Sequence, residues 1–459
     1  MNNDPKIVDL SVVADLLDSK PPTMEEVVAI LDKASEAKGL NLAEVATLLC
    51  AGGQQAQEMI LSRARAVKEA IYGRRVVLFA PLYLSSLCRN DCLYCGFRSS
   101  NRTQERHRLS LEEIKAETRA LVGQGHRRLL VVAGDDGSPL RYLLDSIRTI
   151  YDEKCPTGEI RRINVNVAAM EVDAYRELKA SGIGTYQLFQ ETYHPDTYAI
   201  MHPQGPKSNY GYHLSAMDRA IEGGLEDVGL GVLFGLHEWR FEVLAMLQHA
   251  FHLEERFGFG PHTVSVPRLE PASGSELSSH PPVEVTDSDF LRIIAVLRLA
   301  LPYAGIILST RETAQVRRQG LDIGVSQISA GSRTNPGGYA SRQGAEQFSL
   351  GDHRTLDEVV ADLVGLGHIP SFCTGCYRKG RTGHDFMDLA KPGAIQHFCL
   401  PNALTSFQEY LTQAASAQTR LLGEAAIDTE IQAIGTARVR DRTRQGVEAA
   451  RSGAMDLYV

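Results

Sequence analysis

Several features that would place a chain in a specialised class are missing from this sequence. No apolar stretch approaches the roughly 18 residues of a membrane-spanning helix. The first residues, MNNDPKIVDL, lack the charged-then-apolar pattern of a signal peptide, so we expect a cytoplasmic protein with no membrane partner. There is no internal repeat and no low-complexity tract. Basic residues are interleaved with acidic ones and the net charge is −8, which argues against nucleic acid as a partner.

Cysteine is sparse but strongly clustered. Eight cysteines occur in 459 residues, and in a large chain without a signal pattern they favour metal binding over a disulfide framework. Six of them form two groups of three: Cys88, Cys92 and Cys95, and then Cys373, Cys376 and Cys399. Cys50 and Cys155 stand alone, and we expect both to be small buried side chains.

The order of apolar runs predicts an α/β fold. Residues 1 to about 75 carry apolar residues at helical spacing. Eight short β-type runs follow, most of them separated by amphipathic helical stretches: 76–82, 129–134, 163–168, 185–189, 228–235, 263–267, 305–309 and 323–329. This rhythm is typical of a parallel sheet with crossover helices, and eight repeats favour a closed (β/α)8 TIM-type barrel over an open doubly wound sheet. We therefore predict an N-terminal helical segment (1–75), a barrel (76–340) and a mainly helical C-terminal domain (341–459) that binds a cluster.

The first cysteine group has the spacing Cys88-x3-Cys92-x2-Cys95 and directly follows the first predicted strand. Zinc sites usually need four ligands, so half a zinc site or three unrelated cysteines is the weaker interpretation. Three thiolates in one loop suit a 4Fe–4S cluster with one iron open to another ligand. The position fits catalysis, because barrel active sites lie on the loops at the carboxyl ends of the strands.

This motif, with Tyr94 before its last cysteine, resembles the radical S-adenosylmethionine superfamily. The resemblance implies that Cys88, Cys92 and Cys95 hold the catalytic cluster, whose open iron binds S-adenosylmethionine. Members commonly end their second strand with Gly-Gly-Glu or Gly-Glu, which binds the amino group of the cofactor. Here Gly134, Asp135 and Asp136 occupy that place, so a shorter aspartate or a backbone carbonyl would make the contact.

Polar side chains on the next two strands extend the expected cofactor site. Asn164 and Asn166 are two residues apart and so share one strand face, which we expect to point into the barrel. Buried amides need partners, and the ribose hydroxyls of the cofactor would supply them; a network of core amides is the alternative. Glu191, with Gln187 and Gln190 nearby, ends the following strand and is a candidate for the polar end of the cofactor.

The second cysteine group has the spacing Cys373-x2-Cys376-x22-Cys399. Three thiols again argue for a cluster with an open iron. A structural zinc completed by His384 or His397 is the alternative. The basic residues Arg378, Lys379 and Arg381 would favour an anionic thiolate cluster, although they can also be solvated.

A narrower resemblance covers residues from about 75 to 411. The segments CTGCYRKGRTGHDFMDLAKPG and CLPNAL resemble the C-terminal cluster motif of the HydG family of FeFe-hydrogenase maturases. The segments GTYQLFQETYH, MHPQGPKS, GVLFGLHEW, GPHTVSVPR and SAGSRTNPGGY resemble the barrel that HydG shares with the tyrosine lyase ThiH. ThiH-type enzymes lack the second cysteine triad, so its presence favours HydG.

The resemblance implies a radical lyase that takes a hydrogen atom from the amino group of L-tyrosine and breaks its Cα–Cβ bond. The products would be p-cresol and dehydroglycine, and the second cluster would convert dehydroglycine into carbon monoxide and cyanide for the hydrogenase H-cluster. An additional iron at that cluster would be bound by His262, which matches the position of such a histidine in HydG-like proteins. Ferredoxin or flavodoxin as electron donor and other hydrogenase maturation proteins are the implied partners.

The carboxylate of an amino-acid substrate calls for a guanidinium group. Arg311 is our first candidate, followed by Ser332 and Arg333. Three other functions stay open: a ThiH-like lyase yielding dehydroglycine only, a non-catalytic iron–sulfur scaffold or carrier, and RNA modification, against which the missing basic stripe argues.

Overall fold

A computed structural model describes residues 6–340, 344, 346–390 and 396–458. Its centre is a closed barrel of eight parallel strands: β1 (Arg75–Ser85), β2 (Arg128–Ala133), β5 (Arg162–Asn166), β6 (Tyr186–Gln187), β7 (Val228–Gly231), β8 (Thr263–Ser265), β9 (Gly305–Leu308) and β10 (Gln327–Ser329). Each strand pairs in parallel with the next, and β10 closes the ring on β1. The predicted (β/α)8 architecture is therefore confirmed.

Two of the predicted strands are four residues longer than the strands in the structure. The run predicted as a strand from 323 begins only at Gln327, because Ile323 is the buried last residue of helix α14 (Ala314–Ile323). The run 228–235 leaves the sheet after Gly231. In both cases the extra apolar residues are buried. The apolar run in the sequence therefore extends beyond the strand itself.

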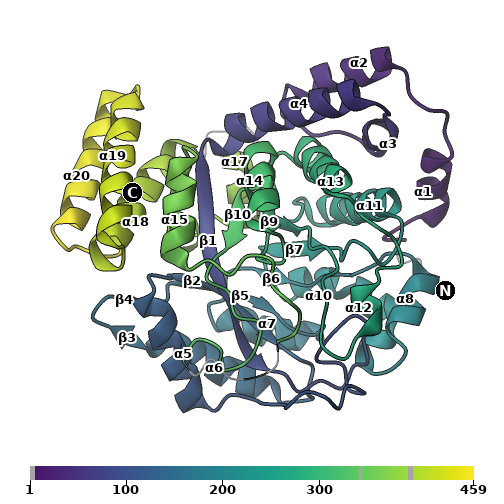
Figure 1. The fold of residues 1–459 in the computed structure, drawn as a ribbon, viewed down its shortest axis with the longest axis horizontal. Coiled ribbons are helices and arrows are strands. Elements are labelled where there is room, and N and C mark those ends of the chain that lie inside the picture. The colour runs from purple at the N-terminus through teal and green to yellow at the C-terminus, as the bar shows by residue number, and fades with distance from the viewer. Residues whose placement is uncertain (1–5, 341–343, 345, 391–395, 459) are drawn as a thin grey trace.

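Helices follow every barrel strand and cover its outside (Figure 1). They are α5 (Leu111–Gly123), α6 (Leu140–Asp152), α7 (Val172–Ala180), α8 (Pro195–Met201), α9 (Tyr210–Leu214), α10 (Ala216–Glu222), α11 (Trp239–Phe257), α12 (Glu276–Ser279), α13 (Asp287–Ala300), α14 and α15 (Leu356–Gly365), with a 3-10 turn at Pro206–Ser208 and a small hairpin of β3 (Lys154–Cys155) and β4 (Gly158–Glu159). Capping boxes at Ser110 and Thr286 satisfy the free N–H groups that begin α5 and α13.

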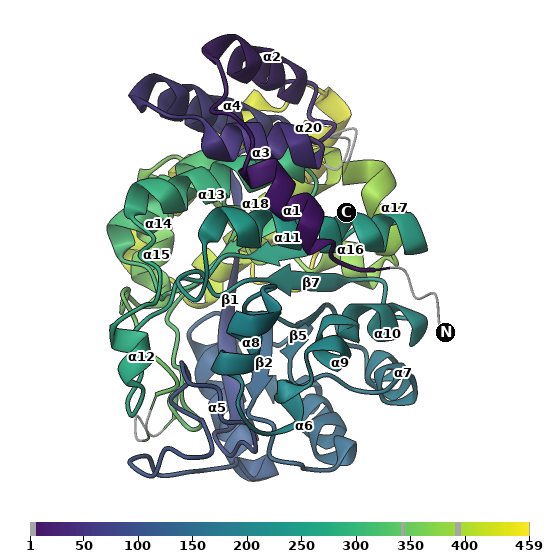
Figure 2. The same ribbon diagram turned by 90° about the vertical axis from the view of Figure 1, so that its right-hand side faces the viewer.

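The N-terminal residues form four helices, as predicted: α1 (Leu10–Leu17), α2 (Met24–Ala34), α3 (Leu42–Cys50) and α4 (Gln54–Tyr72). They pack on the outer barrel helices α11, α13 and α14; Figure 2 shows α2, α3 and α4 at the top of the view and α1 lower, beside α11. The long helix α4 leads directly into β1 and so fixes the amino end of the first strand.

The C-terminal part is mainly helical, with α16 (Gly375–Arg378), α17 (Gly383–Ala390), α18 (Gln396–Gln413), α19 (Ala417–Ala433) and α20 (Ala437–Arg451). It also contains an unpredicted strand, β11 (Ile369–Ser371), which pairs in parallel with Arg75–Val77 of β1. The strand β1 is longer than its barrel neighbours, and β11 covers the edge that its amino end would otherwise expose. The division of the chain at residues 75 and 340 stays a prediction.

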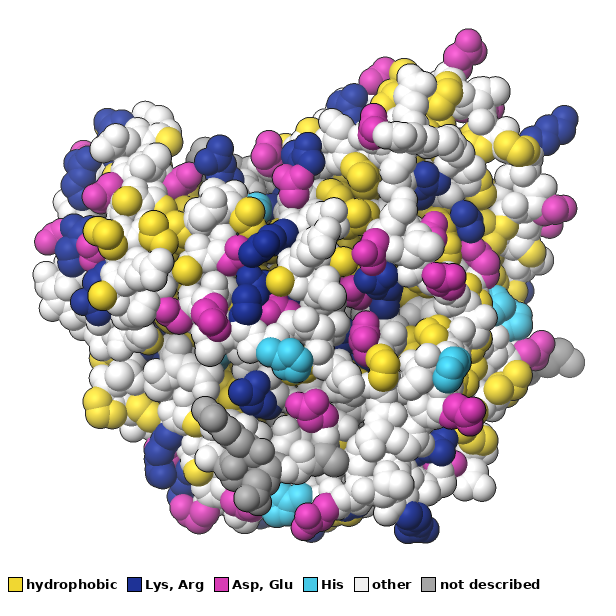
Figure 3. Space-filling model, in the orientation of Figure 1, with side chains coloured by type: hydrophobic (Ala, Val, Ile, Leu, Met, Phe, Trp, Pro, Cys, Tyr) yellow, Lys and Arg dark blue, Asp and Glu magenta, His cyan; other side chains and the backbone are white. Residues whose placement is uncertain are grey.

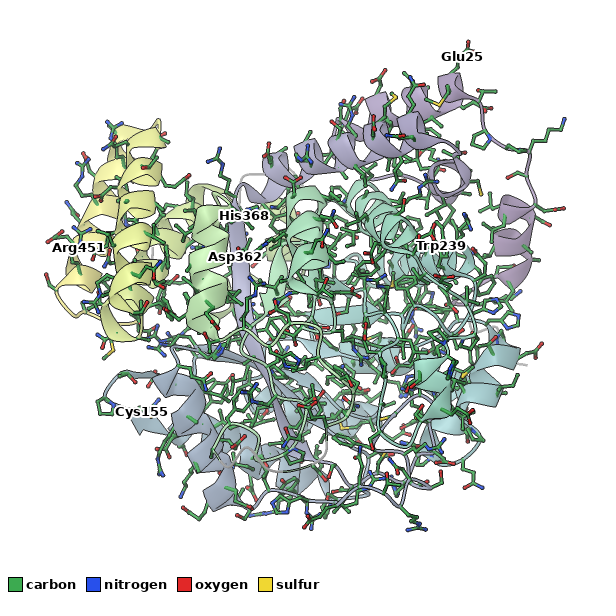
Figure 4. The ribbon with its side chains drawn as sticks, viewed as in Figure 1. Glu25, Cys155, Trp239, Asp362, His368 and Arg451 are labelled. Carbon is green, nitrogen blue, oxygen red and sulfur yellow. The ribbon has the colours of Figure 1, made fainter. Side chains whose placement is uncertain are left out.

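The surface and the isolated cysteines fit this arrangement. Lysine and arginine alternate with acidic side chains over the face in Figure 3, without a single-signed stripe on it. Among the described residues, no helix is both long and apolar enough for a membrane crossing. Cys50 and Cys155 were expected to be buried, but both are only half-buried. Cys50 ends α3, and Cys155 lies in the peripheral β3–β4 hairpin (Figure 4).

Candidate functional site

The first cysteine group lies where the barrel strands end. Cys88, Cys92 and Cys95 follow β1 and line a cavity of about 150 Å³, which we call the upper cavity. Its other walls come from the carboxyl ends of β2, β5 and β6, through Gly134 and Asp135, Asn166, and Glu191. The structure therefore brings together the loop residues that the sequence predicted as one site.

Close backbone packing holds the cysteine loop against the end of β2. Gly134 donates its N–H to the carbonyl of Ser85, at 2.9 Å. A Cβ atom at this position would lie 2.2 Å from the carbonyl oxygen of Leu87, so only glycine fits. Asp135 pairs with Arg89 at 2.8 Å, and its carbonyl accepts the N–H of Arg89 at 2.6 Å. Both polar groups of Asp135 are thus engaged in holding the loop, which does not favour a direct contact between Asp135 and the cofactor.

Glu191 sits in an unusual backbone conformation. Its φ is +68°, a region that non-glycine residues rarely adopt, and such strain is often found at functional sites. The carboxylate of Glu191 accepts a hydrogen bond from the half-buried ammonium of Lys207, at 2.8 Å. Tyr94 lies beside this pair, with Lys207 Nζ 5.9 Å from its ring centroid and its hydroxyl 2.8 Å from His202 Nε2. The cavity thus offers one charge of each sign next to the cysteines.

The thiols of the upper cavity are chemically suited to a cationic cluster core. Burial, only partly offset by Lys207, raises the pKa of Cys92 to about 12. Burial also raises the pKa of Cys88 and of Cys95. Metal ions reverse this effect, since they bind thiolates and displace the protons. Three convergent thiols around a cavity with a half-buried cation fit a 4Fe–4S cluster with one open iron.

A second cavity of about 150 Å³ fills the barrel lumen below the upper one, and we call it the lumen cavity. The two cavities share Tyr94, Cys95, Asn166, Glu191 and Gln347, so they adjoin. Arg311 lines the lumen cavity, with its guanidinium 3.3 Å from the ring centroid of Phe348. Ser332 lines it too, and its hydroxyl has no hydrogen-bond partner in the described part of the chain.

Two predicted site residues lie elsewhere. Arg333 does not line either cavity; its guanidinium donates to the carbonyl of Ser332, at 3.1 Å. The side-chain amide oxygen Oδ1 of Asn164 accepts from Arg162 Nε at 3.0 Å and from the Thr185 N–H at 3.1 Å. Asn164 is therefore a satisfied core amide one layer deeper than Asn166. This geometry favours the structural interpretation of Asn164 over cofactor binding.

The second cysteine group gathers at the opposite end of the barrel. Cys373, Cys376 and Cys399 line a cavity of about 70 Å³, the lower cavity, together with His262. Four arginines line the same space. Three of them are the first residues of neighbouring strands, Arg75 of β1, Arg128 of β2 and Arg162 of β5, and the fourth is Arg381. The lower cavity thus lies at the amino ends of the strands, where β11 delivers the Cys373 loop.

The charges of the lower cavity call for an anionic occupant. Burial, and then the neighbouring Arg162, lowers the pKa of Arg128 to about 9. The Nε atoms of Arg75 and Arg128 have no hydrogen-bond partner within the described residues. The hydrogen bond to Cys399, together with Arg75 and Arg381, lowers the pKa of Cys376 below that of an ordinary thiol. A thiolate-ligated 4Fe–4S cluster carries net negative charge and fits this setting.

The zinc alternative finds less support. His384 does not line the lower cavity, and its ring packs against Phe259 with 5.3 Å between centroids. The side chain of His397 lies outside the described residues. Among the groups that the structure does describe, no three Cys, His, Asp or Glu side chains are arranged to hold a single metal ion. His262 faces Asp227, with 3.7 Å between Nδ1 and Oδ1.

Comparison with known proteins places this geometry in a family. Residues 82–250 match the radical SAM superfamily, and residues 265–369 match the biotin and thiamin synthesis associated domain. The chain is 32% identical over 349 residues to the 2-iminoacetate synthase of Escherichia coli strain K12, covering 74% of this chain and 89% of the relative. A crystal structure of HydG, a maturase of the [FeFe]-hydrogenase, is similar with a TM-score of 0.96 and 47% identity, covering 99% of this chain and 100% of that one. The chain belongs to the HydG-like branch of the radical SAM superfamily.

Other comparisons agree with this HydG-like assignment. The structure of HydG from Carboxydothermus hydrogenoformans matches with a TM-score of 0.84 and 41% identity over 96% of this chain and 97% of that one. The protein is thus a radical SAM lyase, and the family implies S-adenosylmethionine and one 4Fe–4S cluster as cofactors. The upper cavity is where its residues fit both.

Sequence reasoning missed several residues of this HydG-like site. Lys207 lies in the segment MHPQGPKS, whose resemblance to the HydG and ThiH barrel does not by itself assign a role to the lysine. Gln347 carried no signal, because it follows the barrel in a loop without periodicity. The three strand-initial arginines did carry a detectable signal. Each of the first three barrel strands begins with an arginine, although the first residue of a buried barrel strand is usually uncharged.

Proposed function

We propose that this protein cleaves the Cα–Cβ bond of L-tyrosine to give p-cresol and dehydroglycine, and converts dehydroglycine into carbon monoxide and cyanide for the H-cluster of an FeFe-hydrogenase. The observation that carries the proposal is that a single barrel has a three-cysteine cavity at each end. The names of the similar proteins, a 2-iminoacetate synthase and HydG maturases, support both halves of it.

In the upper cavity the cluster and S-adenosylmethionine, when bound, supply a 5′-deoxyadenosyl radical. Side chains of the protein orient the substrate and the cofactor for that reaction. Lys207 and Glu191 offer a cation and an anion to the zwitterionic end of an amino acid or of the cofactor. Tyr94, Asn166 and Glu191 line both adjoining cavities, so they stand between the cofactor and a substrate in the lumen.

In the lumen cavity we assign the tyrosine carboxylate to Arg311. The face of its guanidinium stacks on Phe348, which leaves the N–H edges available for a two-pronged contact. The unpaired hydroxyl of Ser332 would donate to the same carboxylate. Apolar walls, including Phe79, Leu233 and Ile307, exclude water, so that the substrate is the nearest source of hydrogen atoms.

The conversion of dehydroglycine at the second cluster needs no further oxidant or reductant. The tyrosine radical splits into dehydroglycine and a cresolyl radical, which takes one electron from the external ferredoxin- or flavodoxin-type donor and one proton to become p-cresol. The dehydroglycine anion contains the atoms of one cyanide, one carbon monoxide and one water. We assign this second step to the lower cavity, where Cys373, Cys376 and Cys399 would hold a 4Fe–4S cluster and His262 would bind an additional iron.

A ThiH-like lyase that stops at dehydroglycine is the second candidate, and the 32% identity to the Escherichia coli 2-iminoacetate synthase favours it. Cytoplasmic localisation, a ferredoxin or flavodoxin donor and other maturation proteins as partners remain predictions.

The test is an anaerobic assay of reconstituted protein with dithionite, S-adenosylmethionine and L-tyrosine. It quantifies 5′-deoxyadenosine, p-cresol, carbon monoxide and cyanide in wild type, in a Cys376→Ala/Cys399→Ala variant and in Cys92→Ala. A Cys50→Ala/Cys155→Ala variant is the matched control, since neither of these cysteines lines a cavity.

We expect all four products from wild type and the control, p-cresol without carbon monoxide from the Cys376/Cys399 variant, and none from Cys92→Ala. Dehydroglycine, detected as glyoxylate after hydrolysis, with no carbon monoxide from wild type would support the ThiH-like candidate. 5′-Deoxyadenosine without p-cresol would show that tyrosine is the wrong substrate.

A further inference from the structure

Gln347 connects the loop of the first cysteine group with the lumen. It lines both the upper cavity and the lumen cavity, although its loop is far in sequence from the first cysteine group. Its side-chain Nε2 donates to Cys95 Sγ at 3.5 Å, and its Oε1 accepts from the hydroxyl of Tyr83 at 2.7 Å. One amide thus joins a candidate cluster ligand to a residue of strand β1.

The backbone around Gln347 fixes this contact. The carbonyl of Gln347 accepts the N–H of Gly96 at 3.1 Å, and its own N–H donates to the carbonyl of Thr334 at 2.9 Å. A Cβ atom at position 96 would lie 2.8 Å from the Gln347 carbonyl oxygen, so glycine next to Cys95 permits the close approach. The loop and the cysteine are therefore held at a set separation before any cofactor binds.

Tyr83 holds the Gln347 amide with its NH2 group toward the sulfur. The Tyr83 hydroxyl donates to the amide oxygen, and the NH2 group at the other end of the amide donates to Cys95 Sγ. The Tyr83 ring is itself immobilised by an edge-to-face contact with Phe97, with 6.0 Å between centroids. Tyr83 is 4% exposed, and burial raises the pKa of its hydroxyl, so it remains a neutral donor.

We propose that Gln347 is a positioning residue that raises the reduction potential of the cluster on Cys88, Cys92 and Cys95, and that Tyr83 orients it for this purpose. A hydrogen bond to a ligating sulfur withdraws negative charge from the cluster, so it favours the reduced, more negative state. The cluster must accept an electron from an external donor before S-adenosylmethionine is cleaved. Gln347 makes that first electron transfer more favourable.

The inference rests on the proposed function only through the first cluster, which the family already implies, and not on the identity of the substrate. Its test is a redox titration that is monitored by electron paramagnetic resonance. The protein carries Cys376→Ala/Cys399→Ala, so that a single cluster is measured, and neither tyrosine nor S-adenosylmethionine is added.

Three variants separate the parts of the contact. Gln347→Leu removes the donor, Gln347→Glu keeps the shape and the Tyr83 contact but turns an oxygen toward the sulfur, and Tyr83→Phe leaves the amide free to rotate. Gln104→Leu is the matched control, because Gln104 Nε2 donates to the adjacent Glu346 carbonyl at 3.1 Å without contacting a thiol.

We expect the midpoint potential to shift to more negative values in the order Gln347→Glu, Gln347→Leu, Tyr83→Phe, with the largest shift first and no shift in the control. The iron content of Tyr83→Phe should equal that of wild type, because the backbone contacts of residue 347 remain. Wild-type potentials in Tyr83→Phe and Gln347→Leu would overturn the proposal. An equal shift in Gln104→Leu would also overturn it, since a general loosening of the loop would then explain the result.

Discussion

Arg128 and Arg162 are register partners at the first positions of the adjacent strands β2 and β5, so two buried guanidinium groups enter the lower cavity side by side. Arg162 is held by Asn164, Thr185 and Asp227, whereas the guanidinium of Arg128 makes one hydrogen bond within the described residues, to the carbonyl of Cys373 at 2.8 Å. The arrangement is costly without an anion between them, because like charges repel strongly in a buried setting.

Replacing Arg128 by methionine therefore should have opposite effects on the empty and the loaded protein. In cluster-free protein we expect the unfolding free energy to rise by about 1–2 kcal/mol, since an uncompensated buried charge is removed. In reconstituted protein the iron bound at the second triad should fall. Thermal melts and iron analysis of both forms check this, with Arg148→Met on the exposed face of α6 as the control. A lower melting temperature of the cluster-free variant would contradict the idea.

Arg311→Lys tests the assignment of the substrate carboxylate. Lysine keeps the charge but loses the planar, two-pronged contact, so we expect the KM for tyrosine to rise roughly 10–100-fold, equivalent to about 1.4–2.8 kcal/mol. Arg333→Lys is the matched control, because Arg333 does not line the lumen cavity. Steady-state p-cresol formation measures both. If Arg333→Lys raises KM and Arg311→Lys does not, the carboxylate is bound by the other arginine.

Gly134→Ala should disable the first cluster without unfolding the barrel. The added methyl group would lie 2.2 Å from the Leu87 carbonyl oxygen, and the loop that begins with Cys88 must move away. Overpacking of this kind costs about 1–3 kcal/mol, so we expect 5′-deoxyadenosine formation to fall roughly 10-fold or more. Gly123→Ala in α5 meets no atom within 4 Å and should leave the rate unchanged. Equal rates in the two variants would show that the loop adapts.

Glu242 predicts a pH dependence of stability. Burial raises the pKa of this carboxyl to about 8. The carboxyl accepts hydrogen bonds from the Thr192 hydroxyl and, at 2.8 Å, from the Tyr193 N–H, and these two residues directly follow Glu191 in the sequence. Between pH 4.5 and about 8 the folded carboxyl keeps a proton that the unfolded one has lost, so the unfolding free energy falls as pH rises through this window.

Glu242→Gln removes this titration and keeps a polar partner for both groups. We expect the drop in melting temperature of cluster-free protein between pH 5 and pH 8 to be smaller in this variant than in wild type. Glu255→Gln, on the exposed face of the same helix α11, serves as the control and should reproduce the wild-type drop. A wild-type slope in Glu242→Gln would show that another group controls the pH dependence.

The sequence by itself determined the barrel, both cysteine triads and the family. Strand and helix periodicities are local properties, and eight of them in order leave little choice but a closed parallel barrel. The spacing Cys88-x3-Cys92-x2-Cys95 is likewise a property of one loop, so its chemistry can be read without knowing what packs around it.

Only the tertiary structure decided how these parts meet. β11 pairs with the amino end of β1 and so carries Cys373 to the end of the barrel opposite Cys88. Packing between segments hundreds of residues apart placed Gln347 against Cys95, directed Arg311 into the lumen and left Arg333 outside it. Such contacts depend on which surfaces the folded barrel brings together, and no local pattern in the chain encodes them.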